Sequence, residues 1–127
     1  MKRVTLWILA VGMMVSAGVA EASVSCSAAA CSGPAQELIE RLVLTAGGSI
    51  QIDVADRLTA EQIGTLNCTL YADHHMILPA EHLSFQEIFA ALSTAMVTNQ
   101  EISLRIVDGS PDCEIRYISL YSPTTAG

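Results

Sequence analysis

The histidines of this chain are concentrated in one short segment that could support metal or acid–base chemistry. The chain contains three, His74, His75 and His82, and the acids Asp73 and Glu81 lie beside them. Imidazole and carboxylate groups are common zinc ligands, and a histidine next to an acid can also act as a general base. The spacing of these side chains along the local backbone decides which of them can act together.

A metal site requires ligands that share one face. If residues 68–78 form a strand, alternation places His74 and His75 on opposite faces. A zinc site needs three or four ligands, so the set that remains is Asp73, His75 and His82. We expect one inward-facing and two surface histidines, with no metal and no cofactor.

The sequence contains no common catalytic signature. G-x-S-x-G, S-x-x-K and H-E-x-x-H motifs are absent. The only lysine, Lys2, lies in the N-terminal segment, so the rest of the chain cannot form a lysine Schiff base. We therefore expect a protein that is not an enzyme, in which Tyr71, Asp73 and His75 are the candidate ligand-binding residues.

The N-terminal residues indicate export. Lys2 and Arg3 precede an apolar run at residues 4–15, and Ala20-Glu21-Ala22 fits the A-x-A cleavage pattern of a secretory signal peptide. The apolar run is shorter than the roughly 20 residues of a membrane span. Residues 1–22 are predicted to be a cleaved signal peptide. The mature chain is expected to be secreted or periplasmic, without insertion into a membrane.

The charge of the mature chain excludes polyanionic partners. The formal net charge is −7, and removal of Lys2, Arg3 and Glu21 changes it to −8. An acidic domain without lysine cannot neutralise phosphate groups. Nucleic acids and anionic membrane surfaces are therefore not expected to bind.

The four cysteines predict two disulfides, because an even number in a small exported domain is typical of a disulfide framework. Cys26 and Cys31 are close together among small residues, which favours a local loop and leaves Cys68 to pair with Cys113. No C-x-x-C spacing occurs, so a metal centre built from these cysteines is disfavoured.

The hydrophobic pattern predicts five strands and one long helix. Thr59 and Gln62 have the T-x-x-Q spacing of a capping box and predict a short helical turn. A longer helix is predicted from the S-x-x-E capping box at Ser84–Glu87 to about Val97. Its apolar stripe consists of Phe85, Ile88, Phe89, Leu92 and Met96. The strands are expected at Leu38–Thr45, Ile50–Val54, Cys68–Leu78, Ile102–Ile106 and Glu114–Tyr121.

The order β-β-β-α-β-β predicts a mainly β (α+β) fold. It fits a small OB-fold-like five-stranded barrel, with an α+β sandwich as the alternative. In such a barrel the third and fifth strands are neighbours, which favours the pairing of Cys68 with Cys113. The domain is expected to span residues 37–121. A lead-in with the local disulfide, residues 23–36, precedes it, and a loose tail, residues 122–127, follows.

The segment LSFQEIFAALSTAMVTNQEISLRIVDGSPDCEIRYISL carries a resemblance to a known group of proteins. Its features are Phe85 at the helix start, small residues along the helix back (Ala90, Ala91, Ala95), a strand at Ile102–Val107 and Cys113 before the last strand. In this pattern the chain resembles small secreted bacterial OB-fold proteins, above all AB5 toxin B subunits of the subtilase-cytotoxin kind. The resemblance covers about residues 38–120. It implies ring-shaped pentamers that bind cell-surface glycans.

We therefore expect an exported, non-enzymatic binding or interaction module that takes a glycan or a protein partner and forms a homo-oligomer. The alternative is a small secreted or periplasmic enzyme or metal-binding protein that uses Asp73, His75 and His82. The surface expected to mediate self-association is the small-residue back of the predicted helix, Ala91, Ser93, Thr94 and Thr98.

Overall fold

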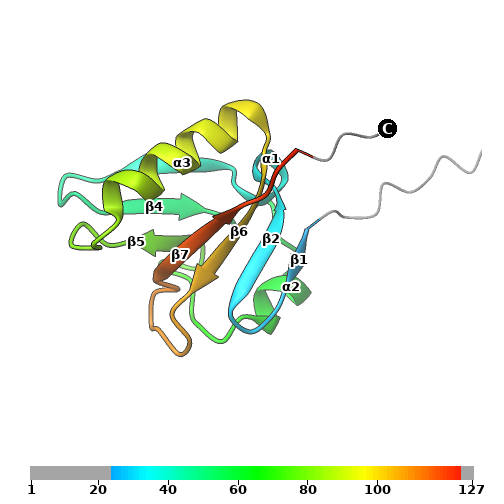
Figure 1. Cartoon of the computed structure of the whole chain (residues 1–127). Helices are drawn as coiled ribbons and strands as arrows, with labels where there is room; N and C mark the ends of the chain where they lie inside the picture. The colour runs from blue at the N-terminus through cyan, green and yellow to red at the C-terminus, as the bar shows by residue number, and fades with distance from the viewer. Residues whose placement is uncertain (1–23, 124–127) are drawn as a thin grey trace, which may run out of the picture.

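The computed structural model describes residues 24–123, which form two antiparallel sheets and three helices (Figure 1). The predicted signal peptide, residues 1–22, and the end of the predicted tail lie outside the described residues. The strands are β1 (Ser25–Cys26), β2 (Ala30–Pro34), β3 (Arg41–Leu44), β4 (Ile50–Asp53), β5 (His75–Leu78), β6 (Glu101–Ile106) and β7 (Ile115–Leu120). The helices are α1 (Ala35–Leu38), α2 (Ala60–Thr65) and α3 (Phe85–Thr98).

The first sheet has the strand order β1-β2-β6-β7 and joins both ends of the described chain. Strand β6 supplies its apolar face, because Ile102, Leu104 and Ile106 alternate and are almost completely buried. Cys31 and Gly33 of β2 lie opposite Leu104 and Ile102. The close neighbour of β6 is therefore a strand with small buried side chains.

Strands β1 and β2 correct the prediction that residues 23–36 are a lead-in without secondary structure. Their buried positions are Cys31 and Gly33, and α1 follows with Ala35 fully buried. Small residues of this kind give no alternation of large apolar side chains, which is the usual sequence signal of a strand. Cys26 and Cys31 lie directly opposite each other in this hairpin, with Cα atoms 4.1 Å apart, and form the predicted local disulfide.

The second sheet has the order β3-β4-β5. Its first two strands form the predicted hairpin, in which the Thr45 amide donates to the Ser49 carbonyl at 3.1 Å. Gly48 in the turn has φ +90°, and a Cβ atom there would lie 3.2 Å from the Ala80 side chain. Both the conformation and the space favour glycine at this position. Ile50 and Ile52 face the core from β4.

The two sheets meet at one point between β5 and β7. Ile77 forms a parallel bridge with Glu114, and the Ile77 amide donates to the Cys113 carbonyl at 3.2 Å. The predicted disulfide between Cys68 and Cys113 lies at this junction. The described residues contain seven strands rather than the five expected, and they show no closed barrel. The fold is therefore mixed α+β, and the five-stranded OB-fold-like barrel is not confirmed.

Helix α3 confirms the predicted long helix and runs above both sheets in Figure 1. Ile88, Leu92 and Ala95 are buried. Phe85, Phe89 and Met96 pack against the core with part of their surface exposed. Five of these six residues form the predicted apolar stripe, and Ala95 lies between its members.

The start of α3 differs from the predicted capping box. Ser84 is the N-cap, but its side chain makes no capping hydrogen bond. Instead the Ser84 amide donates to Nδ1 of His82 at 3.0 Å. The predicted box at α2 is formed, because the Gln62 amide donates to the Thr59 hydroxyl and the Thr59 amide to Oε1 of Gln62. Within residues 24–123, no helix has the length and apolar character needed to cross a bilayer.

Candidate functional site

The segment that carries the histidines forms a tight turn followed by a short strand. Residues 68–78 were expected to be extended throughout, but β5 begins only at His75. Ala72 and Asp73 adopt left-handed backbone conformations, with φ of 50° and 62°. Tyr71 and His75 pair across the turn through hydrogen bonds of 2.8 and 3.0 Å. The prediction of one continuous strand over residues 68–78 is therefore wrong, and strand alternation does not determine how His74 is oriented relative to His75.

His82 does not belong to a ligand cluster with Asp73 and His75. Both of its ring nitrogens have protein partners: Nδ1 accepts the Ser84 amide at 3.0 Å, and Nε2 lies 2.8 Å from the carbonyl oxygen of Arg116. Because Nδ1 accepts, the network assigns the proton to Nε2, which donates to Arg116. His82 thus connects the start of α3 to β7 and has no free lone pair for a metal ion.

The candidate ligand-binding residues Tyr71, Asp73 and His75 lie around one turn. Tyr71 is 43% exposed, and its ring centre lies 6.4 Å from that of His75. Asp73 is exposed at the tip of the turn. His75 is partly buried, and neither ring nitrogen has a hydrogen-bond partner among the described residues. The turn places the Tyr71 ring near that of His75, and none of the three residues lines the two cavities described below.

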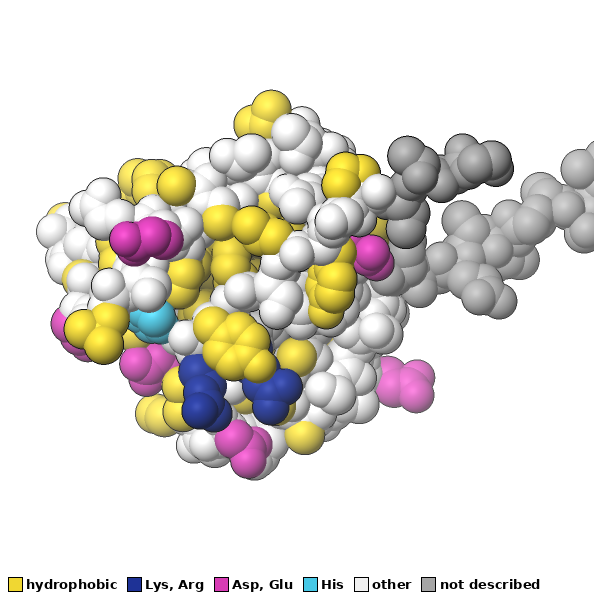
Figure 2. Space-filling view, viewed as in Figure 1, with side chains coloured by type: hydrophobic (Ala, Val, Ile, Leu, Met, Phe, Trp, Pro, Cys, Tyr) yellow, Lys and Arg dark blue, Asp and Glu magenta, His cyan; other side chains and the backbone are white. Residues whose placement is uncertain are grey.

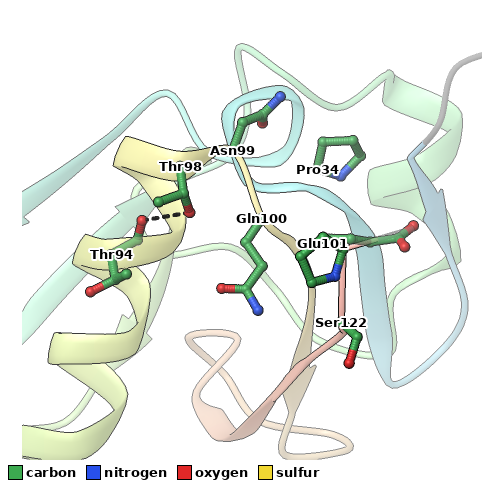
Figure 3. A pocket seen from close by; sticks show the side chains of 8 residues that line it. Pro34, Thr94, Thr98, Asn99, Gln100, Glu101 and Ser122 are labelled. Carbon is green, nitrogen blue, oxygen red and sulfur yellow. Dashed lines mark hydrogen bonds between the residues drawn. The ribbon is translucent and has the colours of Figure 1, made fainter. Parts of the chain in front are cut away.

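A cavity that the sequence reasoning missed lies at the C-terminal end of α3 (Figure 3). Its volume is about 520 Å³, which falls within the range of roughly 300–1,000 Å³ that is typical of small-molecule sites. Thr94 and Thr98 project from α3, and Gln100 lies between the helix and the strands. The lining residues are Pro34, Thr94, Thr98, Asn99, Gln100, Glu101, Ser122 and Pro123.

The walls of this cavity are held by hydrogen bonds between distant segments. The Gln36 amide donates to Oδ1 of Asn99 at 2.9 Å, and Nε2 of Gln36 donates to the Met96 carbonyl at 2.9 Å. Nε2 of Gln100 donates to the Tyr121 carbonyl at 3.0 Å. Asn99 ends α3 in a left-handed conformation with φ 56°, a position where asparagine is favoured. The polar run Thr98–Glu101 after a helix is the sequence signal that could have indicated this site.

The chemistry of the cavity suits an uncharged polar ligand. Its lining side chains offer hydroxyl and amide groups and one carboxylate, Glu101, and none of them is basic. Hydroxyl and amide groups both donate and accept hydrogen bonds, whereas the carboxylate accepts only. A phosphate or carboxylate ligand would meet Glu101 without a compensating cation.

The pairing of β6 and β7 extends to Glu101, which lines this cavity. The Tyr121 amide donates to the Glu101 carbonyl at 3.0 Å, which extends the pairing of β6 and β7. Tyr117 and Tyr121 are each 46% exposed, and the Arg105 guanidinium lies 5.7 Å from the Tyr117 ring centre. Hydrophobic side chains gather at the centre of the face in Figure 2, with basic side chains below them.

The chain was compared with protein families, curated proteins and solved structures. No protein-family model, no curated protein and no solved structure matches the chain.

Proposed function

We propose that the protein is an exported, non-enzymatic binding module that takes an uncharged polar ligand, such as a sugar unit of a glycan, in the cavity at the C-terminal end of α3. The observation that carries the proposal is the lining of this cavity of about 520 Å³, which offers hydroxyl, amide and carboxylate groups beside two prolines and no basic side chain. Sugar hydroxyl groups both donate and accept hydrogen bonds, as these side chains do. Glu101 supplies an acceptor for a pair of ligand hydroxyls.

The exposed tyrosines support the same ligand class. Tyr117 and Tyr121 lie on β7 and directly after it, in alternate register on one face with Ser119 between them. A tyrosine combines an apolar ring face with a polar hydroxyl group, which suits a ligand that has apolar and polar faces of its own. The chain has no tryptophan outside the predicted signal peptide, so tyrosine supplies the aromatic surface.

Export is supported by the two disulfides, since such bonds persist in oxidising compartments. We extend the proposal to self-association through the back of α3, where Ala90 and Val97 are exposed and uncharged and do not line the cavity. Val97 is 84% exposed and would be buried by such a contact. An assembly would place several copies of the cavity side by side and raise the avidity for a repeated ligand such as a glycan.

The cavity is tested by glycan-array binding and titration calorimetry on the mature, oxidised protein. Thr98→Arg places a long side chain in the cavity and is expected to abolish binding of neutral glycans. Thr65→Arg is the matched control, because Thr65 and Thr98 are both exposed helical threonines that donate to a carbonyl of their own helix. Absence of any neutral-glycan binding by the wild type, or equal binding by Thr98→Arg and the wild type, would contradict the proposal.

Self-association has its own test by light scattering over a range of protein concentrations. The double variant Ala90→Arg/Val97→Arg introduces two cations on the helix back, away from the cavity lining, and is expected to yield monomers from an oligomeric wild type. A wild type that is monomeric at high concentration refutes the assembly. An oligomer that persists in the double variant places the contact elsewhere and refutes this surface.

A further inference from the structure

The outer side of the second sheet carries a row of polar side chains across its three strands. Arg41, Asp53 and His75 lie opposite one another on β3, β4 and β5, so their side chains share one face. Asp53 is only 1% exposed. Its Oδ2 atom lies 3.2 Å from Nε of Arg41, but Oδ1 has no hydrogen-bond partner among the described residues. A buried carboxylate oxygen without a partner is energetically unfavourable and is rare in native proteins.

Two further potential ligands lie beside this carboxylate. Asp53, Asp56 and His74 each offer one oxygen or nitrogen atom, and these three atoms lie within 4.8 Å of one another. Asp56 and His74 are exposed, whereas Asp53 is buried. The cluster therefore combines one fixed, dehydrated carboxylate with two side chains that can adjust from the solvent side. His74 is the histidine that strand alternation had separated from His75 and that was left out of the predicted ligand set.

The backbone holds the two turns of this cluster together. The amides of Val54 and Ala55 both donate to the carbonyl oxygen of His74, at 3.0 and 3.3 Å. Asp56 lies in the turn that follows β4, where the amides of Arg57 and Leu58 donate to the Val54 carbonyl. The backbone positions of the three residues are thus set by hydrogen bonds that need no bound ligand, which favours a preorganised site.

We propose that Asp53, Asp56 and His74 bind a divalent transition-metal ion of the zinc class. Two carboxylates and one imidazole form a mixed oxygen and nitrogen set, and three protein ligands with a water molecule complete a tetrahedral zinc site. The two carboxylates carry two negative charges, of which Arg41 compensates only part through one oxygen of Asp53. Zinc bonds of about 2.0–2.2 Å require ligand atoms roughly 3.3–3.6 Å apart, a contraction that the exposed side chains of Asp56 and His74 can make.

His75 lies next to the proposed ligands, in a position from which it could orient them. His75 lies directly opposite Asp53, and its ring centre is 6.0 Å from that of His74. Both of its ring nitrogens are buried without a partner among the described residues. Groups next to metal ligands commonly orient them through hydrogen bonds. The proposed site departs from the sequence-based expectation of no metal, and it is formed by residues other than those of the proposed glycan cavity.

The test uses the mature protein with both disulfides formed, stripped with EDTA and titrated with zinc chloride by calorimetry. We expect one zinc ion per chain. Histidine NMR signals are followed in the same titration, and the imidazole of His74 should respond while that of His82, with both nitrogens engaged, should not. Zinc that does not bind, or that perturbs His82 rather than His74, overturns the proposal.

Variants locate the site. His74→Ala and Asp56→Asn are expected to weaken zinc binding by more than the about 10–100-fold that is typical when a group next to a metal ligand is lost. Asp73→Asn is the matched control, because Asp73 is an exposed carboxylate of the same turn outside the cluster, and it should bind zinc as the wild type does. Equal affinity in His74→Ala and the wild type overturns the proposal.

Two other outcomes also overturn it. The cavity of about 260 Å³ beside β5 contains the acids Glu81, Asp112 and Glu114. Zinc binding that is lost in Glu81→Gln/Glu114→Gln but retained in His74→Ala would assign the ion to that cavity. Binding of calcium but not of zinc would also contradict the proposal. Calcium prefers oxygen ligands, whereas the proposed site depends on the imidazole nitrogen of His74.

Discussion

Arg41 and Asp53 form an ion pair whose two members have very different surroundings. The side chain of Arg41 is 68% exposed and that of Asp53 only 2% exposed. Removal of Arg41 therefore leaves a buried carboxylate without its partner, whereas water can solvate an arginine that has lost its acid. We therefore expect the loss of the Arg41 guanidinium to destabilise the second sheet more than the loss of an exposed ion pair would.

We predict that Arg41→Ala lowers the free energy of unfolding by about 1–3 kcal/mol. The matched control is Arg57→Ala, which removes the ion pair between Nε of Arg57 and Oε2 of Glu40 at 2.6 Å, where both side chains are partly exposed. Exposed pairs of this kind contribute about 0–1 kcal/mol. Urea denaturation in EDTA measures both variants, and equal losses would contradict the asymmetry.

The turn before β5 is the strained element of the second sheet. Ala72 has φ 50°, a left-handed conformation in which a side chain with a Cβ atom is disfavoured and glycine is not. We predict that Ala72→Gly raises the free energy of unfolding by about 0.5–1 kcal/mol. Ala28→Gly, in the exposed turn between β1 and β2 where the backbone has no positive φ, should give no gain. Thermal unfolding of Ala72→Gly and Ala28→Gly, each compared with the wild type, tests this prediction. An Ala72→Gly variant that is no more stable than the wild type would contradict it.

Helix α3 depends on the buried centre of its apolar stripe. Leu92 is completely buried, so Leu92→Ala is predicted to cost about 2–5 kcal/mol of stability through lost burial and the cavity left behind. Val97 is 84% exposed on the same helix, and Val97→Ala should change stability by less than about 0.5 kcal/mol. Denaturant titrations test this difference, and a large loss at Val97 would indicate that the helix back is covered.

The two disulfides constrain the molecule to different extents. Cys26–Cys31 closes a short hairpin, whereas Cys68–Cys113 spans 45 positions and lies where the two sheets meet. In the chain-entropy model they contribute about 2 and about 4 kcal/mol. We predict that Cys68→Ala/Cys113→Ala lowers stability about twice as much as Cys26→Ala/Cys31→Ala, measured by urea denaturation. Equal losses of stability would contradict the larger contribution expected of the Cys68–Cys113 disulfide.

The parts of the fold that depend on large alternating side chains were predictable from the sequence. The hairpin of β3 and β4, the helix α3 and the strand β6 all carry such patterns, and the structure contains them. Strands β1 and β2 were missed because their buried residues are small. The histidine turn was misread because Ala72 and Asp73 reverse the chain without the glycine that usually marks such a turn.

The candidate sites were less predictable, because they depend on contacts between distant segments. The cavity at the end of α3 combines Pro34 with residues 94–101 and 122–123. The cluster of Asp53, Asp56 and His74 depends on the backbone bonds from Val54 and Ala55 to His74. Neither contact follows from local spacing. Spacing did identify the correct cysteine pairs, because one of them is local.

The register of the first sheet has a consequence for the order in which the chain can fold. Ala30 lies opposite Arg105, and Pro34 opposite Glu101, so β2 can pair with β1 early but has no partner along its other edge until most of the chain has been synthesised. Such long-range pairing slows folding. Cys26 and Cys31, by contrast, meet within one hairpin and can oxidise early. Once Cys26 and Cys31 are bonded to each other, neither thiol can pair with Cys68. Cys68 then remains free to pair with Cys113, the last of the four cysteines to be synthesised.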